Sequence, residues 1–111
     1  MIMQVFSALA DPTRAKIVQV LATRDLSAGE IAARFPVSRP AVSRHLGVLR
    51  KARLVHCRDE AQRRVYSLNP AGLDEIEKWV ERCRRIWNRR LDDLGRHLDA
   101  MAAPERTGGK R

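Results

Sequence analysis

The sequence predicts a mainly α-helical fold with one small β-hairpin, of the winged helix-turn-helix type. Small polar residues suited to capping helices recur along the chain, and two of them are followed at once by proline, which fits the first turn of a helix. Farther along, two β-branched or alternating runs flank a short polar link, as in a hairpin. We therefore expect the order helix-helix-helix-helix-strand-strand-helix.

The first three helices follow from their apolar spacing and their caps. A first helix is expected over residues 3–9, and a second begins at Asp11-Pro12 and runs to about Thr23, with apolar residues on one face. A third is expected over residues 28–34. The run S-A-G-E at 27–30 before it fits a capping box, in which each end side chain bonds the free backbone N–H of the other residue.

A helix-turn-helix and a wing follow. Ser38 caps a fourth helix that runs to about Ala52, after a Phe-Pro-Val segment that cannot readily extend the third helix. The spacing of these two helices is that of a helix-turn-helix. The hairpin strands are expected at residues 54–58 and 64–68, with the polar link 59–63 between them, and this hairpin would be the wing.

The last helix is the longest. Asn69 caps it, and it runs from Pro70 to about Met101, with acidic residues near its start, where the helix dipole favours them. The tail at 102–111 holds proline, glycine and basic residues without an apolar period, so we expect it to be disordered. Residues 1–101 are expected to form one winged helix-turn-helix domain.

The chain is strongly basic. Its 111 residues are enough for one compact domain, and 44% hydrophobic with 32% charged residues is a globular composition. Lys and Arg number 22 against 13 Asp and Glu, a formal charge of +9, which favours nucleic acid as the partner over an acidic protein or a membrane surface. With neither a membrane span nor a signal peptide recognisable, we expect a cytoplasmic protein and no membrane partner.

The spacing of the cysteines and the absence of catalytic motifs argue against metal, redox and enzymatic chemistry. Cys57 and Cys83 lie 26 residues apart and belong to no Cys-x-x-Cys or Cys/His cluster, which predicts reduced thiols and neither a disulfide nor a zinc site. The sequence also shows no Ser/His/Asp or Cys/His constellation and no Gly-rich phosphate loop. We therefore expect no enzymatic activity and no cofactor.

The fourth helix has one packed face and one free face. A helical wheel places Ala41, Val42, His45, Leu46 and Leu49 together on the packed face. The free face suits the major groove of DNA, because Arg can bridge guanine O6 and N7 and because Pro and Gly leave little bulk beside the base edges. A merely solvated basic face is the alternative, which the capped helix before it and the basic hairpin after it disfavour. The free face comprises Arg39, Pro40, Ser43, Arg44, Gly47, Arg50 and Lys51.

Three segments, ALADPTRAKIVQVLA, LSAGEIAARFPVSRPAVSRHLGVLRKARLV and RRVYSL, resemble the ArsR-type winged-helix repressors of bacteria, over roughly residues 4–100. The match is strongest at 38–55, where the run S-x-P-A-V-S-x-H-L stands. The resemblance implies a dimer that represses transcription from a palindromic promoter element, with the fourth helix facing bases and the hairpin tip reaching the flanking backbone or minor groove. The expected DNA-binding residues are Ser38, Arg39, Pro40, Ser43, Arg44, His45, Arg50, Gln62, Arg63 and Arg64.

Two features depart from the family pattern. Arg53 stands where relatives commonly have Gly after the fourth helix, a position suited to left-handed backbone, and keeping that geometry would cost about 1 kcal/mol. The hairpin tip also lacks the Gly that is frequent in relatives. The path of the chain out of the fourth helix and the turn type of the wing therefore stay open.

The usual sensor motifs of the family are absent. Where metal-sensing relatives have Cys-x-Cys, this chain has Glu30, Ala32 and Ala33, and His97 with Asp93 on the last helix offers too few ligands for a tetrahedral site. We expect no metal site and a plain autorepressor or a regulator controlled by a partner protein. A ligand-, metal- or redox-responsive repressor with a non-standard site, or a winged-helix protein-interaction module, stays open as an alternative.

The last helix carries an apolar stripe, at steps of three and four, that exceeds what a small domain can cover. A second copy of this helix would bury the stripe and set two recognition helices about 34 Å apart, one turn of DNA. We therefore expect a sequence-specific, DNA-binding transcriptional regulator that acts as a homodimeric repressor. The expected dimer interface comprises Val5, Phe6, Leu9, Ile76, Val80, Cys83, Trp87, Leu91, Leu94 and Leu98.

Overall fold

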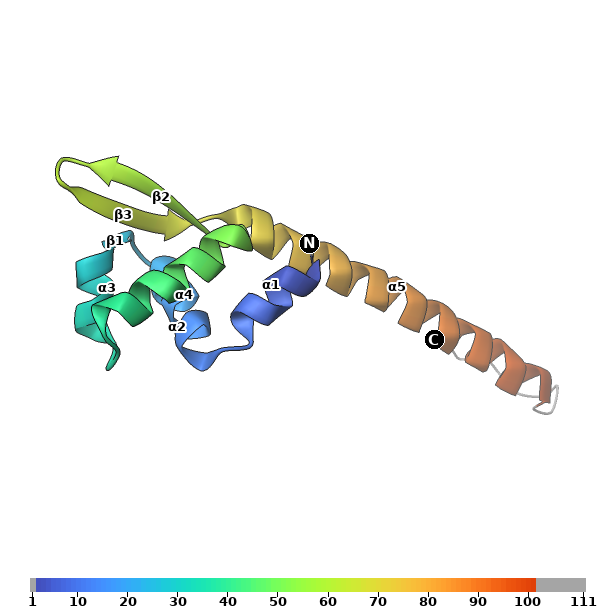
Figure 1. Cartoon of the computed structure of the whole chain (residues 1–111). Helices are drawn as coiled ribbons and strands as arrows, with labels where there is room; N and C mark the ends of the chain where they lie inside the picture. Colours follow the sequence, from blue (N-terminus) through green and yellow to red (C-terminus); the bar gives the residue numbers. More distant parts are fainter. Residues whose placement is uncertain (1, 102–111) are drawn as a thin grey trace. The chain divides into compact units, whose positions relative to one another are not determined.

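The computed structural model describes residues 2–101, which form five helices and three strands (Figure 1). The predicted order of helices and hairpin is confirmed, and β1 is one strand more than the sequence predicted. The tail at 102–111, predicted to be disordered, lies outside the described residues. In chain order the elements are α1 (Ile2–Leu9), α2 (Pro12–Leu21), β1 (Leu26–Ser27), α3 (Ala28–Arg34), α4 (Arg39–Lys51), β2 (Val55–Glu60), β3 (Arg63–Leu68) and α5 (Pro70–Met101).

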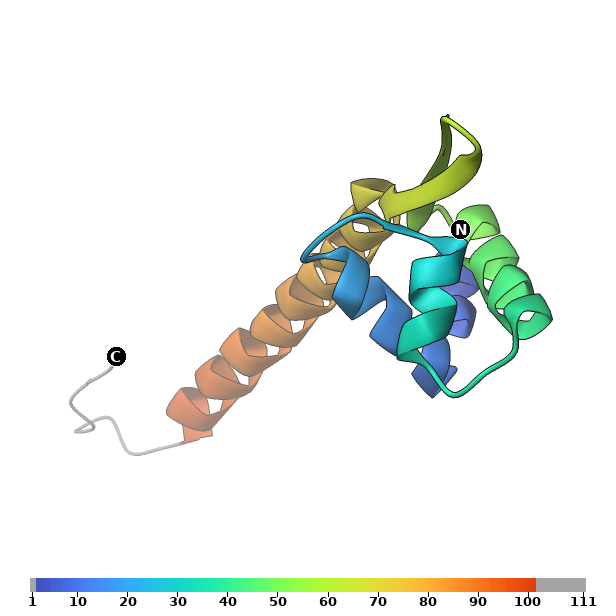
Figure 2. The same cartoon turned by 90° about the vertical axis from the view of Figure 1, so that its left-hand side faces the viewer.

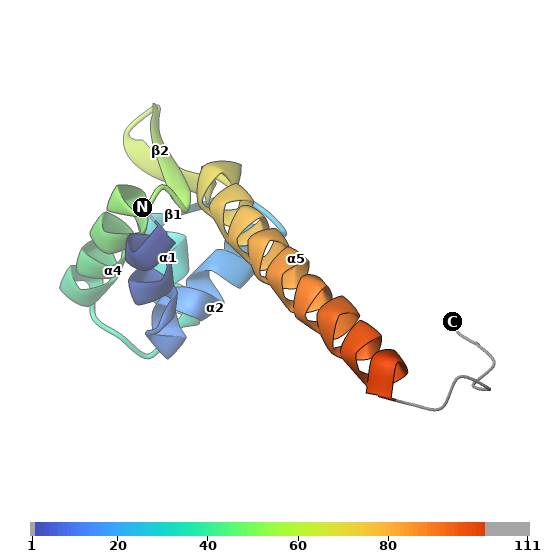
Figure 3. The same cartoon turned by 90° about the vertical axis from the view of Figure 1, so that its right-hand side faces the viewer.

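Two parts of the chain are compact by themselves. The first, which we call the winged-helix unit, extends to Glu77 and holds α1 to α4, the sheet and the start of α5. The second begins at Lys78 and consists, within the described residues, of the rest of α5. In the winged-helix unit, α1, α2 and α4 lie against one another (Figure 3), and a short loop joins α3 to α4 (Figure 2).

Each of the four polar residues predicted to cap a helix binds a backbone N–H in the first turn. Ser27 and Glu30 form the complete capping box, because the Ser27 backbone N–H also donates to Glu30 Oε1 at 2.8 Å. Local sequence therefore determines where α2, α3, α4 and α5 begin. The side-chain oxygens of Asp11, Ser27, Ser38 and Asn69 accept from the backbone N–H of Arg14, Glu30, Ala41 and Ala71, at 2.9–3.2 Å.

The sheet is antiparallel, with the order β1-β3-β2. Strands β2 and β3 reach the tip of the wing, where Glu60 pairs with Arg63 and only two residues, Ala61 and Gln62, form the turn. The predicted five-residue link was wrong, since three of its charged residues, Asp59, Glu60 and Arg63, belong to the strands. They are cross-strand partners of opposite charge, which stabilise the ladder. Ala61 has a φ of 57°, the left-handed backbone that the tip needs in the absence of Gly.

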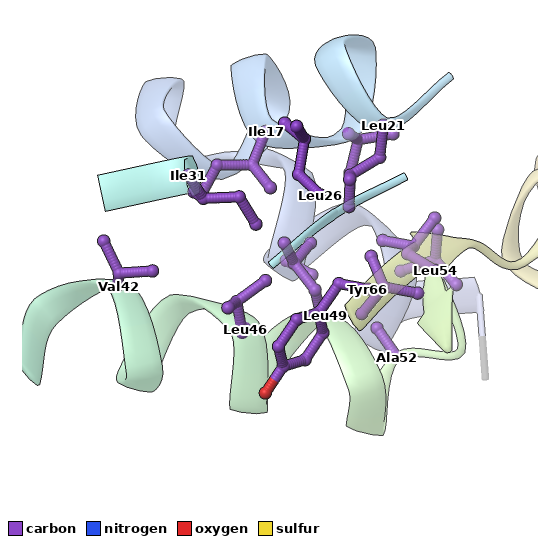
Figure 4. Close-up of a cluster of buried hydrophobic side chains, with 14 residues drawn as sticks. Ile17, Leu21, Leu26, Ile31, Val42, Leu46, Leu49, Ala52, Leu54 and Tyr66 are labelled. Atoms are coloured by element: carbon purple, nitrogen blue, oxygen red, sulfur yellow. The ribbon is translucent and has the colours of Figure 1, made fainter. Parts of the chain in front are cut away.

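One apolar core holds the winged-helix unit together, and Figure 4 shows part of it. Ile17, Leu49 and Leu54 are fully buried, and Tyr66 of β3 is 6% exposed. Val5 of α1, which the sequence analysis assigned to a dimer interface, is instead 2% exposed within its own chain. That assignment was wrong because α1 turns Val5 and Ala8 into the core against α2 and α4.

Helix α4 ends in a Schellman motif, although its left-handed residue is an arginine. Arg53 has a φ of 62°, its N–H donates to Arg50 O at 2.9 Å, and Leu54 N–H donates to Leu49 O at 2.9 Å. The left-handed geometry that the sequence analysis left open at this position is therefore present, with Arg53 in the place that favours Gly.

The chain that follows the wing returns to this corner. Gly72 N–H donates to Arg53 O at 2.8 Å, and Asn69 N–H donates to Leu54 O at 2.9 Å. A Cβ on Gly72 would stand 2.7 Å from Leu54 Cδ2 and 2.9 Å from Arg53 O, so the close approach requires Gly at this position.

No helix within residues 2–101 is long and apolar enough to cross a membrane.

Candidate nucleic-acid interface

The two faces predicted for α4 are confirmed. Val42, Leu46 and Leu49 are buried, and Ala41 and His45 are half-buried. The opposite face, expected to meet DNA, is exposed along the whole helix. It consists of Arg39, Pro40, Ser43, Arg44, Gly47, Arg50 and Lys51, and Ser38 at the N-cap is exposed as well.

The cations on this face are not neutralised by the protein. Within the described part of the chain, none of Arg39, Arg44, Arg50 and Lys51 forms a salt bridge, whereas the cations of the wing do. An anion that approaches α4 therefore meets guanidinium groups that need not leave a carboxylate first. Gly47 in this face keeps the backbone accessible, since a Cβ there would meet no other part of the structure within 4 Å.

The wing cations carry acidic partners. Arg63 lies 3.7 Å from Glu30 and 3.9 Å from Glu60, and Arg64 lies 3.7 Å from Asp59. All these side chains are largely exposed, so each pair contributes little stability and can exchange for another anion. Gln62 at the tip is exposed and uncharged.

A further ion pair links the wing to the segment before β1. Arg58 of β2 donates to Asp25, before β1, at 2.9 Å, and this hydrogen bond raises the pKa of Arg58 above its usual value. The hydrogen bond joins the middle of the wing to the strand that flanks it. The side chains of this pair are 47% and 45% exposed, so the ion pair supplements the pairing of β1 with β3, which holds the base of the wing.

His45 has a partner inside the protein. Its Nδ1 lies 3.3 Å from Arg14 Nη1, and because arginine can only donate, Nδ1 is the acceptor of this hydrogen bond. Arg14 also donates through Nε to Ala8 O at 2.7 Å and through Nη2 to Ser7 O at 3.3 Å. One ring nitrogen of His45 is thus used within the winged-helix unit, and any contact with DNA would fall to the rest of the ring.

Two carboxylates support the helices behind α4. The pKa of Asp11 is lowered, chiefly because its carboxylate accepts the backbone N–H of Arg14. The pKa of Glu30 is lowered, chiefly because its carboxylate accepts the backbone N–H of Ser27. Both groups stay ionised at neutral pH, where they hold the first turns of α2 and α3.

A polar depression of about 410 Å³ lies where the first turn of α3, the first half of α4 and the wing meet. Sequence reasoning assigned several of its residues to DNA but missed those from the β1–α3 turn and Tyr66. Pairing of β1 with β3 brings them together, and β1 is too short to show a strand pattern. The lining residues are Ser27, Ala28, Gly29, Arg39, Ser43, Gln62, Arg63, Arg64 and Tyr66.

Tyr66 connects this depression to the core. Burial raises the pKa of its hydroxyl, and a hydrogen bond with the Cys57 thiol raises it further, while the positive charges of Arg64 and Arg50 act in the opposite direction. The hydroxyl is therefore neutral at physiological pH. Arg50 of α4 and Arg64 of the wing thus both lie near one side chain.

The candidate sensor residues do not gather. Cys57 is half-buried on β2 and Cys83 is exposed on α5, and both are free thiols. Asp93, considered with His97 as a possible pair, is hydrogen-bonded to Arg96 instead. Among residues 2–101 there is no group of three His, Cys, Asp or Glu side chains that could hold a metal ion.

The second unit exposes the apolar stripe of α5. Trp87, Leu91, Leu94 and Leu98 are 46–53% exposed, and Val80 and Cys83 are exposed too. Ile86, which sequence reasoning did not include, is 52% exposed, and its i+7 spacing from Trp79 could have revealed it. The other predicted interface residues belong to the winged-helix unit, where Phe6, Leu9 and Ile76 are half-buried.

Known proteins share this arrangement. Residues 11–56, which hold the helix-turn-helix, match the family described as "Bacterial regulatory protein, arsR family". The HTH-type transcriptional regulator Rv2034 of Mycobacterium tuberculosis is 46% identical over 95 residues, 86% of this chain and 86% of that protein. The transcriptional repressor SdpR of Bacillus subtilis is 40% identical over 76 residues, 68% of this chain and 84% of SdpR.

A solved structure extends the likeness to most of the chain. The ArsR-like transcriptional regulator from Rhodococcus sp. RHA1 aligns with a TM-score of 0.76 and 33% sequence identity, over 93% of this chain and 93% of that one. The similarity therefore reaches beyond the helix-turn-helix to the wing and the last helix.

Proposed function

The chain belongs to the arsR family of bacterial regulatory proteins and is a DNA-binding transcriptional regulator, and we propose that it acts as a homodimer that represses transcription from a palindromic promoter site. Its relatives are regulators and not enzymes. A bacterial regulator of this family acts on DNA in the cytoplasm, and we propose the same place of action for this protein.

The free face of α4 is the single observation that carries this proposal. This face carries four cations that make no ion pair within residues 2–101. It also carries a serine and a glycine, and all of these residues are exposed. Side chains of this kind on a helix read base edges in the major groove, where Arg bridges guanine O6 and N7. Ser43 and Arg44 at its centre are the residues we expect to contact bases.

The exposed stripe on α5 supports the dimer. Large apolar side chains from Val80 to Leu98 are a third or more exposed, and a contiguous patch of this kind marks an interaction surface. A second copy of the same helix supplies a matching stripe. Two-fold symmetry would then present two copies of α4 to two half-sites, which is why we propose a palindromic operator.

Repression is supported by the function that the name of SdpR states. A dimer bound to promoter DNA would repress transcription by excluding the polymerase, and repression would then need no activity beyond DNA binding.

In vitro selection from random duplexes, followed by footprinting on the selected sequence, tests the proposal. We expect an inverted repeat whose half-sites are one helical turn, about 34 Å, apart. Light scattering in the same buffer should give the mass of a dimer. A reporter placed behind the selected site should lose expression when the protein is produced. Binding without sequence preference would contradict the proposal, and a rise in reporter expression would contradict repression.

A further inference from the structure

We propose that the depression between α4 and the wing holds one phosphate of the DNA backbone, with Arg39 as its principal ligand. The inference rests on the proposed binding of the protein to operator DNA. It changes the role of Arg39, which the sequence analysis placed among the residues that face bases.

The position of Arg39 on α4 separates it from Arg44, the arginine expected to read bases. With 3.6 residues per turn, Ser43 lies about 40° and Arg50 about 20° around the helix from Arg39, whereas Arg44 lies about 140° away. Arg39 and Ser43 line the depression, and Arg44 does not. The exposed face of α4 therefore consists of two rows, one turned to the wing and one turned away from it.

The guanidinium of Arg39 is held at the wall of the depression. Its Nη1 lies 3.6 Å from the place that a Cβ on Gly29 would occupy, in the first turn of α3. The absence of a side chain at Gly29 leaves this space open. The guanidinium has no acidic partner within residues 2–101, so its hydrogen-bond donors are available to a ligand.

The other lining groups suit the same ligand. Arg63 and Arg64 add two more guanidinium groups, and Gln62 adds an uncharged donor. The acidic neighbours compete weakly, because the pairs of Arg63 with Glu30 and of Arg64 with Asp59 are 3.7 Å long and exposed. Glu30 in addition keeps its hydrogen bond from the Ser27 N–H when Arg63 leaves.

A phosphodiester is the anion that this set fits. A guanidinium binds two phosphate oxygens at once, and three guanidinium groups around one depression match the charge and the planar donor geometry of that contact. A volume of about 410 Å³ is many times what one water needs, so a backbone phosphate can enter with part of its hydration. DNA that lies in contact with both α4 and the wing passes over this depression.

Operators that carry one uncharged methylphosphonate linkage, moved along the backbone of one half-site, test the proposal. For the wild type we expect one linkage at which the substitution lowers affinity by about tenfold, the effect of removing one charge-assisted hydrogen bond. For Arg39→Ala, affinity for the unmodified operator should already be low, and the same linkage should have no further effect. Arg39→Lys should bind more tightly than Arg39→Ala and less tightly than the wild type, because lysine keeps the positive charge but cannot bind two phosphate oxygens at once.

Arg44→Ala is the matched control. It removes an equally exposed arginine from the other row of α4, and its sensitivity to the methylphosphonate should stay at about tenfold. The inference would be overturned if Arg39→Ala kept the full sensitivity at every linkage and lost its preference for the operator over random DNA. It would also be overturned if calorimetry showed inorganic phosphate binding that depends on Arg39 while no linkage in the operator mattered. If the wild type bound no DNA at all, the proposed function itself would fail.

Discussion

Arg14 of α2 and His45 of α4 meet across the winged-helix unit, with Nη1 and Nδ1 separated by 3.3 Å. The same guanidinium also donates to the backbone carbonyls of Ser7 and Ala8 in the last turn of α1. One side chain therefore joins the end of α1, the start of α2 and the recognition helix. This contact adds to the packing of Val42, Leu46 and Leu49 in the core, which turns the opposite face of α4 outward.

Replacing Arg14 should destabilise the fold. Arg14→Met leaves two carbonyl oxygens and His45 Nδ1 without their donor, and we expect the free energy of unfolding to fall by about 1–3 kcal/mol. Lys16→Met, a change of the same kind at an exposed position of α2, should alter it by less than about 0.5 kcal/mol. Urea unfolding at one fixed protein concentration measures both, and equal effects would show that the hydrogen bonds of Arg14 are unimportant.

Acid should weaken the fold through the helix caps. The pKa values of Asp11 and Glu30 lie below their ordinary values of 3.8 and 4.5. A carboxylate with a lowered pKa stabilises the folded state fully above its ordinary value, and loses this contribution as the pH falls through the lowered one. Asp11→Asn/Glu30→Gln keeps both cap acceptors and removes both titrations.

The double variant should therefore show a shallower decline of unfolding free energy than the wild type between about pH 4.5 and pH 3. At pH 7 it should be somewhat less stable, because charged acceptors form the stronger hydrogen bonds. Urea unfolding across this pH range is the measurement. Parallel pH profiles for the two proteins would mean that other carboxylates dominate acid unfolding.

Glycine at position 53 should stabilise the protein. Arg53 occupies the left-handed region at the end of α4, and Arg53→Gly relieves a backbone cost of about 1 kcal/mol. The control is Arg44→Gly, at an exposed position in the middle of α4, which should cost about 0.5–1 kcal/mol. The midpoint temperature of thermal unfolding should rise for Arg53→Gly and fall for the control. A loss of stability in both would place the strain of this corner elsewhere.

Two charges on the stripe of α5 should separate the proposed dimer. Leu91→Glu/Leu94→Glu would bury two carboxylates at the interface, and we expect monomers with greatly weakened operator binding. Arg89→Glu/Arg96→Glu introduces the same residue type on the opposite side of the helix, about 160° and 140° around it from Leu91, and should stay dimeric. Light scattering at micromolar concentration decides between these outcomes. A monomeric wild type would remove the basis of the prediction.

Arg44 and the wing arginines should affect DNA binding in different ways. Arg44→Ala should cost about 1–3 kcal/mol on the operator and much less on random DNA, because the variant can no longer read its base pair. Arg63→Ala/Arg64→Ala should weaken binding to both DNAs alike and flatten the salt dependence by about one unit for each phosphate that is no longer neutralised. Fluorescence anisotropy titrations at several salt concentrations measure both. The opposite pattern would show that the two roles are exchanged.

Features that depend on near neighbours in the chain could be predicted from the sequence. The caps at Asp11, Ser27 and Ser38 bind backbone groups only three residues ahead, so a short pattern contains both partners. The two faces of α4 follow from helical periodicity in the same way. The long last helix was likewise visible in its cap and its stripe.

Features that join distant segments could not be predicted. His45 is 31 residues from Arg14, and nothing in either local sequence indicates the other. β1 has two residues and exists only because β3 offers it an edge. Val5 belongs to an apolar pattern that fits a dimer interface and a core equally well, and only the packing of α1 decides between them.

The wing leaves the protein and returns to it at a single corner. Hydrogen bonds from Asn69 to Leu54 and from Gly72 to Arg53 close its base. They join the end of α4 directly to the start of α5, and this connection does not depend on the conformation of the hairpin tip. Insertions, deletions or exchanges at the tip around Ala61 therefore leave the framework intact. The tip can diverge from one regulator to another, and with it the DNA flanking each half-site, while the recognition helix keeps its position.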